Sequence, residues 1–352
     1  MKILITGICG FAGTSIAKTL LQSHSNLQII GLDNFSRKGS ELNISELTNL
    51  GIDLIRGDIR SQSDIDALPK TDWVIDCAAN PSVLAGIDGQ SSSRQLMEHN
   101  LLGTINLLEY CKRHKAGLIL LSTSRVYSAS ELAALPVLSS DNRFELQDCN
   151  ISGANCSGIS ENFPTTAPLS LYGASKLASE TLILEYGECF DFPVWINRCG
   201  VLAGAGQFGK ADQGIFSFWI HSFREKKPLK YIGFNGTGHQ VRDALHPKDL
   251  VTLLSRQMLE PDWEAPEIIN LGGGFENSMS LKELSNWCED RFGQNEVLAS
   301  QDERPMDAPW IVMDSTIAQN AWNWSVKTKI DQILEEIATH AEKNSEWLKL
   351  CN

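Results

Sequence analysis

The sequence has little positive charge and no long apolar run, and both absences exclude classes of protein. Its 352 residues carry 30 Lys and Arg against 43 Asp and Glu, a formal net charge of −13. That balance argues against a nucleic acid or an anionic membrane as the partner, because both attract cationic surfaces. No apolar run reaches the length of a membrane span, and the chain opens on a strand-like segment instead of a signal peptide. We therefore expect a cytoplasmic protein with no membrane or nucleic-acid partner.

Cysteine pairing patterns are also missing. The nine cysteines are odd in number and include no Cys-x-x-Cys pair. This favours reduced thiols and gives no indication of zinc or another metal. The length and an apolar content of 42% suit one large or two modest globular domains.

What the sequence does contain, at its start, is a strand, a glycine turn and a helix. Ile3-Leu4-Ile5 is a short apolar run, and apolar residues recur at helical spacing from Phe11 to Leu21. Gly7, Gly10 and Gly13 lie at the spacing that lets a backbone approach a pyrophosphate at a helix N-terminus. A glycine turn that packs and binds nothing is the simpler alternative.

An acid at the end of the second predicted strand favours the dinucleotide interpretation. The apolar run Leu27 to Leu32 ends in Asp33, twenty residues after Gly13, where a carboxylate would bind the ribose hydroxyls of NAD. Arg37 follows in a polar turn, and an arginine there can accept the 2′-phosphate of NADP. An ionised Asp33 would repel that phosphate, so NAD is the favoured cofactor.

A third predicted strand ends at Gly57, and Asp58 follows it. This carboxylate could reach the adenine amino group of the cofactor. Aspartate is also a preferred helix N-cap, and a helix is predicted from Ser61 to Leu68. The sequence leaves both interpretations open.

Further alternation of strands and helices indicates the fold. Apolar strands are predicted at Trp73 to Ala79 and Gly117 to Leu121, separated by an amphipathic helix from Arg94 to His114. Ala78 and Ala79 are small enough to leave room for a cofactor. Five strands alternating with helices predict an α/β, Rossmann-type, doubly wound parallel sheet with helices on both faces. Ligands bind such sheets at the carboxyl ends of the strands.

The alternation weakens in the second half of the chain. We predict a smaller mixed α/β lobe there. Residues 1–197 would form the NAD-binding domain with the catalytic residues, and residues 198–352 mainly the substrate-binding lobe, with some segments returning to the first sheet. Helices are expected at Asp212 to Arg224, Leu281 to Arg291 and Ile330 to Leu348. Whether a helix face builds a homo-oligomer is left open.

A proton-transfer set follows the fifth strand. Thr123 lies at its end, and Tyr172 and Lys176 are i and i+4 on a later predicted helix. These two share one helical face, so the ammonium is expected to lower the pKa of the phenol and make it a usable base. The Thr123 hydroxyl would bind the alcohol or carbonyl oxygen of the substrate. The simpler alternative is an ordinary amphipathic helix with a solvated lysine.

These motifs together resemble the extended short-chain dehydrogenase/reductase family, whose members act on nucleotide sugars. The resemblance rests on Thr6-Gly7-x-x-Gly10-Phe11-x-Gly13, Asp33, Gly57-Asp58, Asn100-x-x-Gly103-Thr104, Thr123-x-x-Val126-Tyr127, Tyr172-x-x-x-Lys176, Gln240-Val241-Arg242-Asp243-Ala244-Leu245-His246, Ile269-Asn270-Leu271-Gly272-Gly273-Gly274 and Arg304-x-x-Asp307. Three features are similar to its CDP-paratose 2-epimerase branch. They are residues 33–39, the long insertion between residues 123 and 172, and Gln207-Phe208-x-x-x-Asp212-Gln213-Gly214.

The resemblance implies an NAD-dependent enzyme that inverts a hexose carbon of a nucleotide sugar through a transient ketose, with Tyr172 removing the hydroxyl proton. The cofactor-binding residues so implied are Gly7, Gly10, Phe11, Ala12, Gly13, Asp33, Asn34, Ser36, Arg37, Asp58, Ile59, Ala78, Ala79, Asn100, Tyr172 and Lys176. The candidate substrate-binding residues are Gln207, Arg242, Arg304, Asp307 and Cys199. For Arg242 the alternative is an ion pair with Asp243 or another acid, and for Cys199 it is core packing.

Two places depart from the family pattern. Asp76 stands where the fourth strand usually carries histidine, and the asparagine and tyrosine that usually follow the sixth-strand arginine are absent after Arg198. A 4-epimerase, dehydratase or reductase of the same family therefore remains an alternative. Dehydration is disfavoured, because Ser124 and Arg125 stand where dehydratases carry a carboxylate. A non-catalytic NAD(P)-sensing or RNA-associated protein is the alternative from another class, and the proton-transfer set argues against it.

Overall fold

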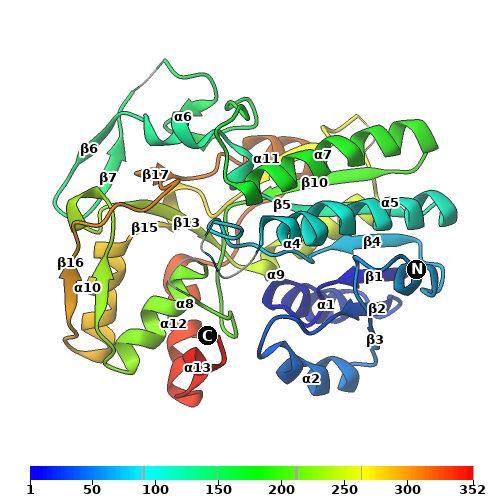
Figure 1. Cartoon of the computed structure of the whole chain (residues 1–352), viewed down its shortest axis with the longest axis horizontal. Coiled ribbons are helices and arrows are strands. Elements are labelled where there is room, and N and C mark those ends of the chain that lie inside the picture. The colour runs from blue at the N-terminus through cyan, green and yellow to red at the C-terminus, as the bar shows by residue number, and fades with distance from the viewer. Residues whose placement is uncertain (88, 90–91, 149, 211–212, 263, 352) are drawn as a thin grey trace.

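A seven-stranded parallel sheet lies at the centre of the molecule (Figure 1). The computed structural model describes residues 1–87, 89, 92–148, 150–210, 213–262 and 264–351. In spatial order the strands are β14 (Ile268–Leu271), β10 (Val194–Cys199), β5 (Gly117–Thr123), β4 (Trp73–Asp76), β1 (Lys2–Thr6), β2 (Gln28–Asp33) and β3 (Asp53–Arg56). Every neighbouring pair is parallel. The order reverses between β1 and β4, which is where such sheets bind ligands.

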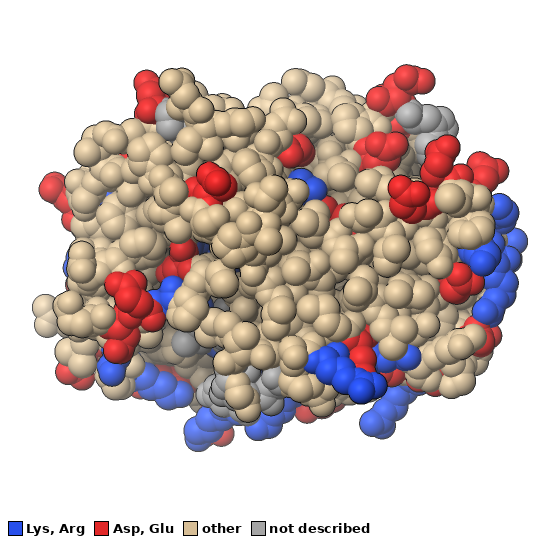
Figure 2. Space-filling view, turned by 45° about the horizontal axis from the view of Figure 1, so that its top comes forward, with Lys and Arg blue, Asp and Glu red and all other residues tan. Residues whose placement is uncertain are grey.

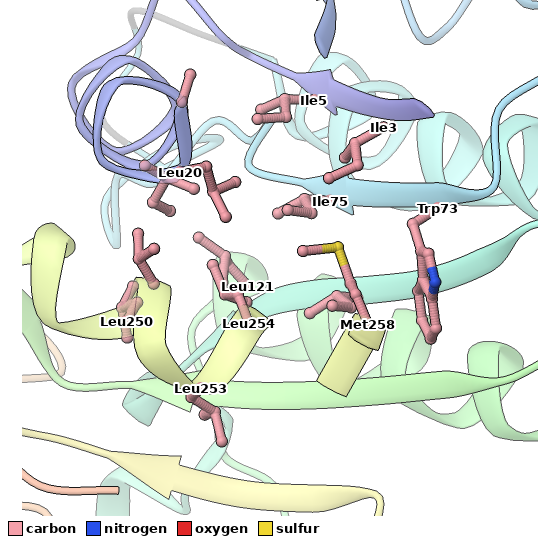
Figure 3. Close-up of a cluster of buried hydrophobic side chains, with 14 of the residues drawn as sticks. Ile3, Ile5, Leu20, Trp73, Ile75, Leu121, Leu250, Leu253, Leu254 and Met258 are labelled. Atoms are coloured by element: carbon pink, nitrogen blue, oxygen red, sulfur yellow. The ribbon is translucent and has the colours of Figure 1, made fainter. Parts of the chain in front are cut away.

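Helices cover both faces of this sheet, as predicted. One face carries α1 (Phe11–Ser23), α2 (Ile44–Asn49), α9 (Pro247–Leu259) and α11 (Thr316–Trp322), and the other carries α3 (Gln62–Asp66), α5 (Gly103–His114) and α7 (Leu171–Phe190). Ile3 and Ile5 belong to the first core and Leu4 to the second, because successive side chains of a strand point to opposite faces. Figure 3 shows side chains of β1, β4 and α9 meeting in the first core.

The carboxyl half adds a second, mixed lobe (Figure 1). Its main sheet contains β11 (Val201–Leu202), β13 (Val241–Leu245), β15 (Ser278–Ser280) and β17 (Trp310–Ile311). Helices α8 (Ile215–Arg224), α10 (Leu281–Phe292) and α12 (Ile330–Lys343) enclose a third core. A two-stranded sheet of this half pairs β12 (Leu229–Tyr231) with β16 (Val297–Ala299). Two more lie in the insertion between residues 123 and 172, where β6 (Val137–Ser139) pairs with β7 (Phe144–Leu146) and β8 (Ala154–Asn155) with β9 (Gly158–Ile159). Strand β14 and helix α9 of the carboxyl half belong to the first sheet and its covering layer.

Several element boundaries differ from the predicted ones. Strand β4 ends at Asp76, because the amide of Ala78 donates to the Asp76 carboxylate (3.2 Å) instead of continuing the ladder. The helix predicted from Arg94 to His114 is divided into α4 (Ser93–Met97), the π-turn η2 (Glu98–Leu102) and α5. The last predicted helix is also divided, since α12 ends at Lys343 and α13 spans Trp347–Cys351. Helix α8 begins at Ile215, and Asp212, the predicted start, lies outside the described residues.

The surface and the cysteines complete the description. On the face in Figure 2, uncharged side chains fill most of the centre, while lysines and arginines lie near its margin. Across the residues that the structure describes, none of the helices combines the length and the apolarity that a membrane span requires. Seven cysteines are free thiols, while Cys149 and the side chain of Cys351 fall outside the described part of the chain.

Candidate active site

The carboxyl ends of β1, β4, β5 and β10 border a cavity of about 380 Å³. Most of the predicted site residues line it. From the amino half these are Gly7, Gly10, Phe11, Ala12, Gly13, Asp33, Asn34, Ser36, Arg37, Ile59, Ala78, Ala79, Thr123 and Tyr172, and from the carboxyl half Cys199 and Gln207. Asp58, Asn100, Lys176, Arg242, Arg304 and Asp307 are not among the lining residues of this cavity.

The glycine turn is a cradle that side chains would fill. Gly7 has a φ of +60°, and a Cβ there would lie 2.9 Å from the Cα of Ala78. A Cβ on Gly13 would lie 2.5 Å from the carbonyl oxygen of Gly7. Helix α1 starts beside this cradle with Gly10 as its N-cap, no side-chain cap and no acid in its first turn. Its amide groups and the positive end of its dipole therefore fit the diphosphate of a dinucleotide.

Asp33 is held at the cavity by the backbone. Its Oδ2 accepts a hydrogen bond from the amide of Cys9 (2.9 Å) and its Oδ1 one from the amide of Phe35 (2.8 Å). Burial raises the pKa of the carboxyl group, and these two hydrogen bonds oppose the rise. The side-chain Oδ1 of neighbouring Asn34 accepts a hydrogen bond from the backbone amide of Ser36 (2.9 Å). The loop is thus fixed where the ribose hydroxyls of NAD were predicted.

Arg37 makes contacts that the sequence did not indicate. Its guanidinium donates to the carbonyl oxygen of Phe208 and to Oε1 of Gln213 (3.3 Å), both in the carboxyl half. An arginine so engaged does not supply the guanidinium that a 2′-phosphate requires. The contacts therefore agree with the choice of NAD over NADP.

Asp58 is paired with an arginine, and its predicted N-cap alternative is wrong. Arg60 donates to both of its carboxylate oxygens at 2.7–3.1 Å, and this pairing holds the pKa of Asp58 well below its usual range. Ser61 is the cap of α3, with its hydroxyl accepting from the amide of Asp64 (3.4 Å). Ile59, rather than Asp58, lines the cavity.

Asn100 supports the site from behind the wall. It is 3% exposed, accepts from the amide of Asn80 (2.8 Å) and donates to the carbonyl oxygen of Asn80 (3.1 Å) and to Ser175 Oγ (3.1 Å). These bonds tie the loop after β4 to helix α7. The side chain therefore positions the cavity wall without forming its surface.

The structure brings Thr123 and Tyr172 together. Thr123 ends β5, opposite Cys199 of β10, and Tyr172 lies in the first turn of α7. Because a Cβ on Gly173 would lie 2.1 Å from the carbonyl oxygen of Arg125, only glycine lets α7 begin so close to the chain that leaves β5. Thr123 and Tyr172 both line the cavity, and the Thr123 side chain acts to lower the pKa of the Tyr172 phenol.

The electrostatics of Tyr172 differ from the prediction. Burial raises the pKa of Tyr172 to about 12, opposed by the hydrogen bond with Thr123 and by the charge of Arg125. Lys176, expected to lower this pKa, is not among the groups that do so. It is 2% exposed, and burial lowers its own pKa while Asp76 and Glu180 oppose that shift. The i, i+4 spacing was a poor guide here, because burial outweighs the effect of a neighbouring charge.

Asp76, the departure in the fourth strand, joins two strand ends. Its Oδ1 accepts from the hydroxyl of Thr6 (2.5 Å) and from the amide of Ala78 (3.2 Å). It is 2% exposed. The carboxylate thereby fixes the end of β1, where the glycine turn begins, against the small residues that follow β4.

A buried ion pair beneath the cavity was not predicted. Arg198 of β10 and Glu180 of α7 lie 2.7 Å apart, with side chains 6% and 2% exposed. Ser122 donates to the same carboxylate, and Arg198 also donates to the hydroxyl of Tyr127 (3.3 Å). Although burial opposes its charge, Glu180 raises the pKa of Arg198. The sequence signal that could have drawn attention to this pair is the position of Glu180, four residues after Lys176.

The predicted substrate arginines form a cluster beside the cavity. Arg242 pairs with Asp307 (2.6 Å), which matches the ion-pair alternative, though with a partner other than Asp243. Arg125 lines the cavity and donates to the carbonyl oxygen of Met306 (3.3 Å). Burial and then the charge of Arg242 lower the pKa of Arg125 to about 10, with Asp307 opposing and Arg304 adding to the shift. Three arginines near two acids, Asp307 and Asp243, leave an excess of positive charge that suits an anionic ligand.

Cys199 is packed, and so are most of the aromatic residues that the sequence offers for stacking on a nucleobase, Phe208, Phe216, Phe218 and Trp219. Cys199 is 4% exposed, and burial raises the pKa of its thiol to about 12. Phe216 and Trp219 are 2% exposed in the third core. Phe208, by contrast, lines the cavity.

Comparison with known proteins identifies the family. Residues 3–272, more than half of the chain, match the model of the NAD dependent epimerase/dehydratase family. The chain belongs to this family. Within it, the CDP-paratose 2-epimerase of Salmonella typhi is 30% identical over 339 residues, 93% of this chain and 95% of that protein. The UDP-glucuronate 4-epimerase of Thermodesulfobacterium geofontis is 25% identical and covers 98% of both chains.

Solved structures in this family share the fold. The structure of UDP-glucuronic acid 4-epimerase from Bacillus cereus, in complex with UDP-glucuronic acid and NAD, has a TM-score of 0.77 and 25% identity, and covers 97% of this chain and 99% of that one. The predicted membership in the extended short-chain dehydrogenase/reductase family and the predicted Rossmann-type fold are confirmed. The protein is therefore an enzyme of the epimerase/dehydratase kind, as the sequence predicted.

Proposed function

We propose that the protein is an NAD-dependent nucleotide-sugar epimerase, with a substrate resembling that of CDP-paratose 2-epimerase. The observation that carries the proposal is that Thr123 and Tyr172 line the same cavity as the glycine cradle. The relatives named above add support, since both curated ones are epimerases of nucleotide sugars.

The residues of the cavity suit a proton transfer at a sugar hydroxyl. NAD, when bound, supplies a hydride acceptor that can later return the hydride. Tyr172 removes the hydroxyl proton of the sugar and later gives it back to the ketose oxygen, while Thr123 holds that oxygen by a hydrogen bond. The pKa of about 12 for Tyr172 means that its proton acceptance depends on nearby positive charge, for which Arg125 is the candidate.

The remaining residues would hold the two ligands. Gly7, Gly10, Gly13 and the start of α1 would bind the cofactor diphosphate, and Asp33 the adenosine ribose. Arg125, Arg242 and Arg304 would bind the substrate diphosphate, whose charge compensates the excess of the cluster.

Dehydration is the less favoured activity of the family for this chain. Elimination of water needs an acid or base besides the tyrosine. Among the described residues that line the cavity, Asp33 at the end of β2 is the one carboxylate. Ser124 and Arg125 occupy the positions after Thr123, which favours epimerisation.

The test is incubation of the purified enzyme in D₂O with CDP-, UDP-, GDP- and dTDP-sugars, followed by NMR of the products. We expect inversion at one carbon, no deuterium on that carbon, and no net change in NAD, because the hydride returns to the carbon it left. Deuterium at the inverted carbon, loss of water, or no product from any sugar would contradict the proposal. The Tyr172→Phe variant serves as the inactive control.

A further inference from the structure

Three segments that are distant in sequence meet at one edge of the cavity, in a group that we call the clasp: Arg37, Gln207, Phe208, Gln213 and Trp347. The first four line the cavity. Trp347 does not, but it begins helix α13 at the carboxyl end of the chain. The clasp therefore joins the amino half, the carboxyl half and the last helix.

Polar contacts hold the clasp from both sides. On one side, Arg37 donates to the carbonyl oxygen of Phe208 and to Gln213 Oε1 (3.3 Å). On the other, the indole Nε1 of Trp347 donates to the carbonyl oxygen of Gln207 (2.9 Å). The backbone of residues 207–208 is thus held between Arg37, in what we call the cofactor loop (residues 33–39), and Trp347 of α13.

Ring packing reinforces these hydrogen bonds. Phe208 and Trp347 are stacked, with centroids 5.1 Å apart and planes 14° apart. Gly39, with a φ of +92°, lies directly against Phe208, since a Cβ there would be 2.7 Å from Cε1 of that ring. Arg37 adds a cation–π contact at 5.8 Å. Phe208 is therefore packed between the cofactor loop and α13.

The apolar part of the clasp is a small cluster of its own, although Trp347 also packs against the rings of His221 and His340 on α8 and α12. This cluster consists of Phe208 and Trp347, with the partly buried Leu350 packed against them. A small apolar cluster of this kind opens at lower free energy than the large cores around the sheets. Since its residues form part of the cavity wall, opening the clasp would open the cavity.

We propose that Trp347 is a positioning residue for the cofactor. By holding Gln207 and Phe208 against Arg37, it closes the cavity beside the cofactor loop and slows the release of NAD. The proposal rests on NAD as the cofactor of the proposed function. It has a direct use in that reaction, because an enzyme that lost its cofactor before returning the hydride would strand the ketose.

The test measures cofactor release without turnover. Protein loaded with adenine-labelled radioactive NAD is diluted into excess unlabelled NAD, and the label still bound is followed by rapid gel filtration. Trp347→Ala loses both the stack and the hydrogen bond, and we expect release to accelerate about 10- to 100-fold. Trp347→Phe keeps an aromatic ring and should fall between the alanine variant and the wild type.

Two further variants make the result specific. Lys349→Ala is the matched control on the same helix, because Lys349 pairs with the exposed Glu346 and should leave the release rate unchanged. Arg37→Met releases the clasp from the opposite side and should also accelerate release, so the proposal stays testable if Trp347→Ala fails to fold. Equal release rates in the wild type and in folded clasp variants would overturn the clasp alone. A wild-type protein that binds no NAD would overturn the proposed function and the clasp with it.

Discussion

The two walls of the cavity are built differently. The amino-half wall consists of strand ends and backbone: glycines too close to their neighbours to accept a Cβ, and Asp76 bonded to Thr6 and Ala78. The carboxyl-half wall depends on contacts between segments that are distant in sequence, such as those of Phe208 and Gln213 with Arg37. The amino-half wall suits the cofactor, which the enzymes of the family share. The carboxyl-half wall suits the substrate, because the substitution of a few side chains there can change which sugar binds.

The largest effect is expected at Tyr172. Tyr172→Phe removes the hydroxyl that exchanges the proton, so turnover should fall by about 10²- to 10⁴-fold. NAD binding should persist, because the glycine cradle is unchanged. Epimerase rates and NAD content after denaturation measure both. Tyr186→Phe on the same helix, whose hydroxyl bonds Glu109 (3.0 Å), is the matched control. Normal turnover in Tyr172→Phe would rule out this residue as the base.

A buried charge beneath the amino-half wall should have the next largest effect. Glu180→Gln leaves Arg198 buried without its ion-pair partner, and we expect a loss of about 3–5 kcal/mol in the free energy of unfolding. Glu335→Gln breaks the exposed pair with Arg291, whose side chains are 31% and 52% exposed, and should lose less than about 1 kcal/mol. Denaturant unfolding compares the two. Equal losses would mean that the Glu180 pair adds no more than a surface pair.

The glycine cradle can be tested against a glycine with similar backbone geometry. Gly7→Ala and Gly51→Ala both place a Cβ at positive φ, +60° and +79°, but only Gly7 has Ala78 in the way, since nothing lies within 4 Å of a Cβ on Gly51. The difference in unfolding free energy should be about 1–3 kcal/mol, and only Gly7→Ala should weaken NAD binding. Similar NAD affinity in both variants would argue against a cradle at Gly7.

The same contrast explains what sequence reasoning could reach. The glycine turn, Asp33 and Thr123 follow buried strands, and parallel strands present their carboxyl ends at one edge, so periodicity alone brings these residues together. The parallel sheet with helices on both faces follows from the same alternation, whereas its strand order was not predicted. Even in the amino half, periodicity does not predict side-chain pairing. Asp58 pairs with Arg60, and that ion pair depends on local side-chain geometry.

The long-range side-chain contacts and the burial of the site could not be predicted in that way. Arg37, predicted beside the adenosine ribose, is bonded to Phe208 across the cavity, and no local pattern connects residues 171 positions apart. The sequence drew attention to Arg125 only because it stands where dehydratases carry a carboxylate, although its side chain lines the cavity. The pKa of Tyr172 also depends on burial, which is a property of the packed molecule and not of i, i+4 spacing.

An effect that is confined to acid pH concerns the stability of the carboxyl half. His221 of α8 is 1% exposed, and its Nε2 lies 3.4 Å from Nδ1 of His340. Burial, and then the charge of His340, lowers the pKa of His221 to about 3. The unfolded chain therefore binds a proton that the folded one does not. The contribution of neutral His221 to stability is complete above about pH 6.5 and is lost as the pH falls toward 3.

Replacing this ring should flatten the pH dependence. Nδ1 of His221 is buried with no hydrogen-bond partner in the described part of the chain, so phenylalanine can occupy the site. We expect His221→Phe to reduce the loss of unfolding free energy below pH 6.5 by at most about 1.4 kcal/mol per pH unit, the value for one proton. Between pH 7 and 8 the wild type and the variant should differ by a constant amount. Curves that stay parallel down to pH 4 would show that His221 binds a proton equally in both states. A flatter curve for the variant would instead assign part of the acid sensitivity to the carboxyl half of the molecule.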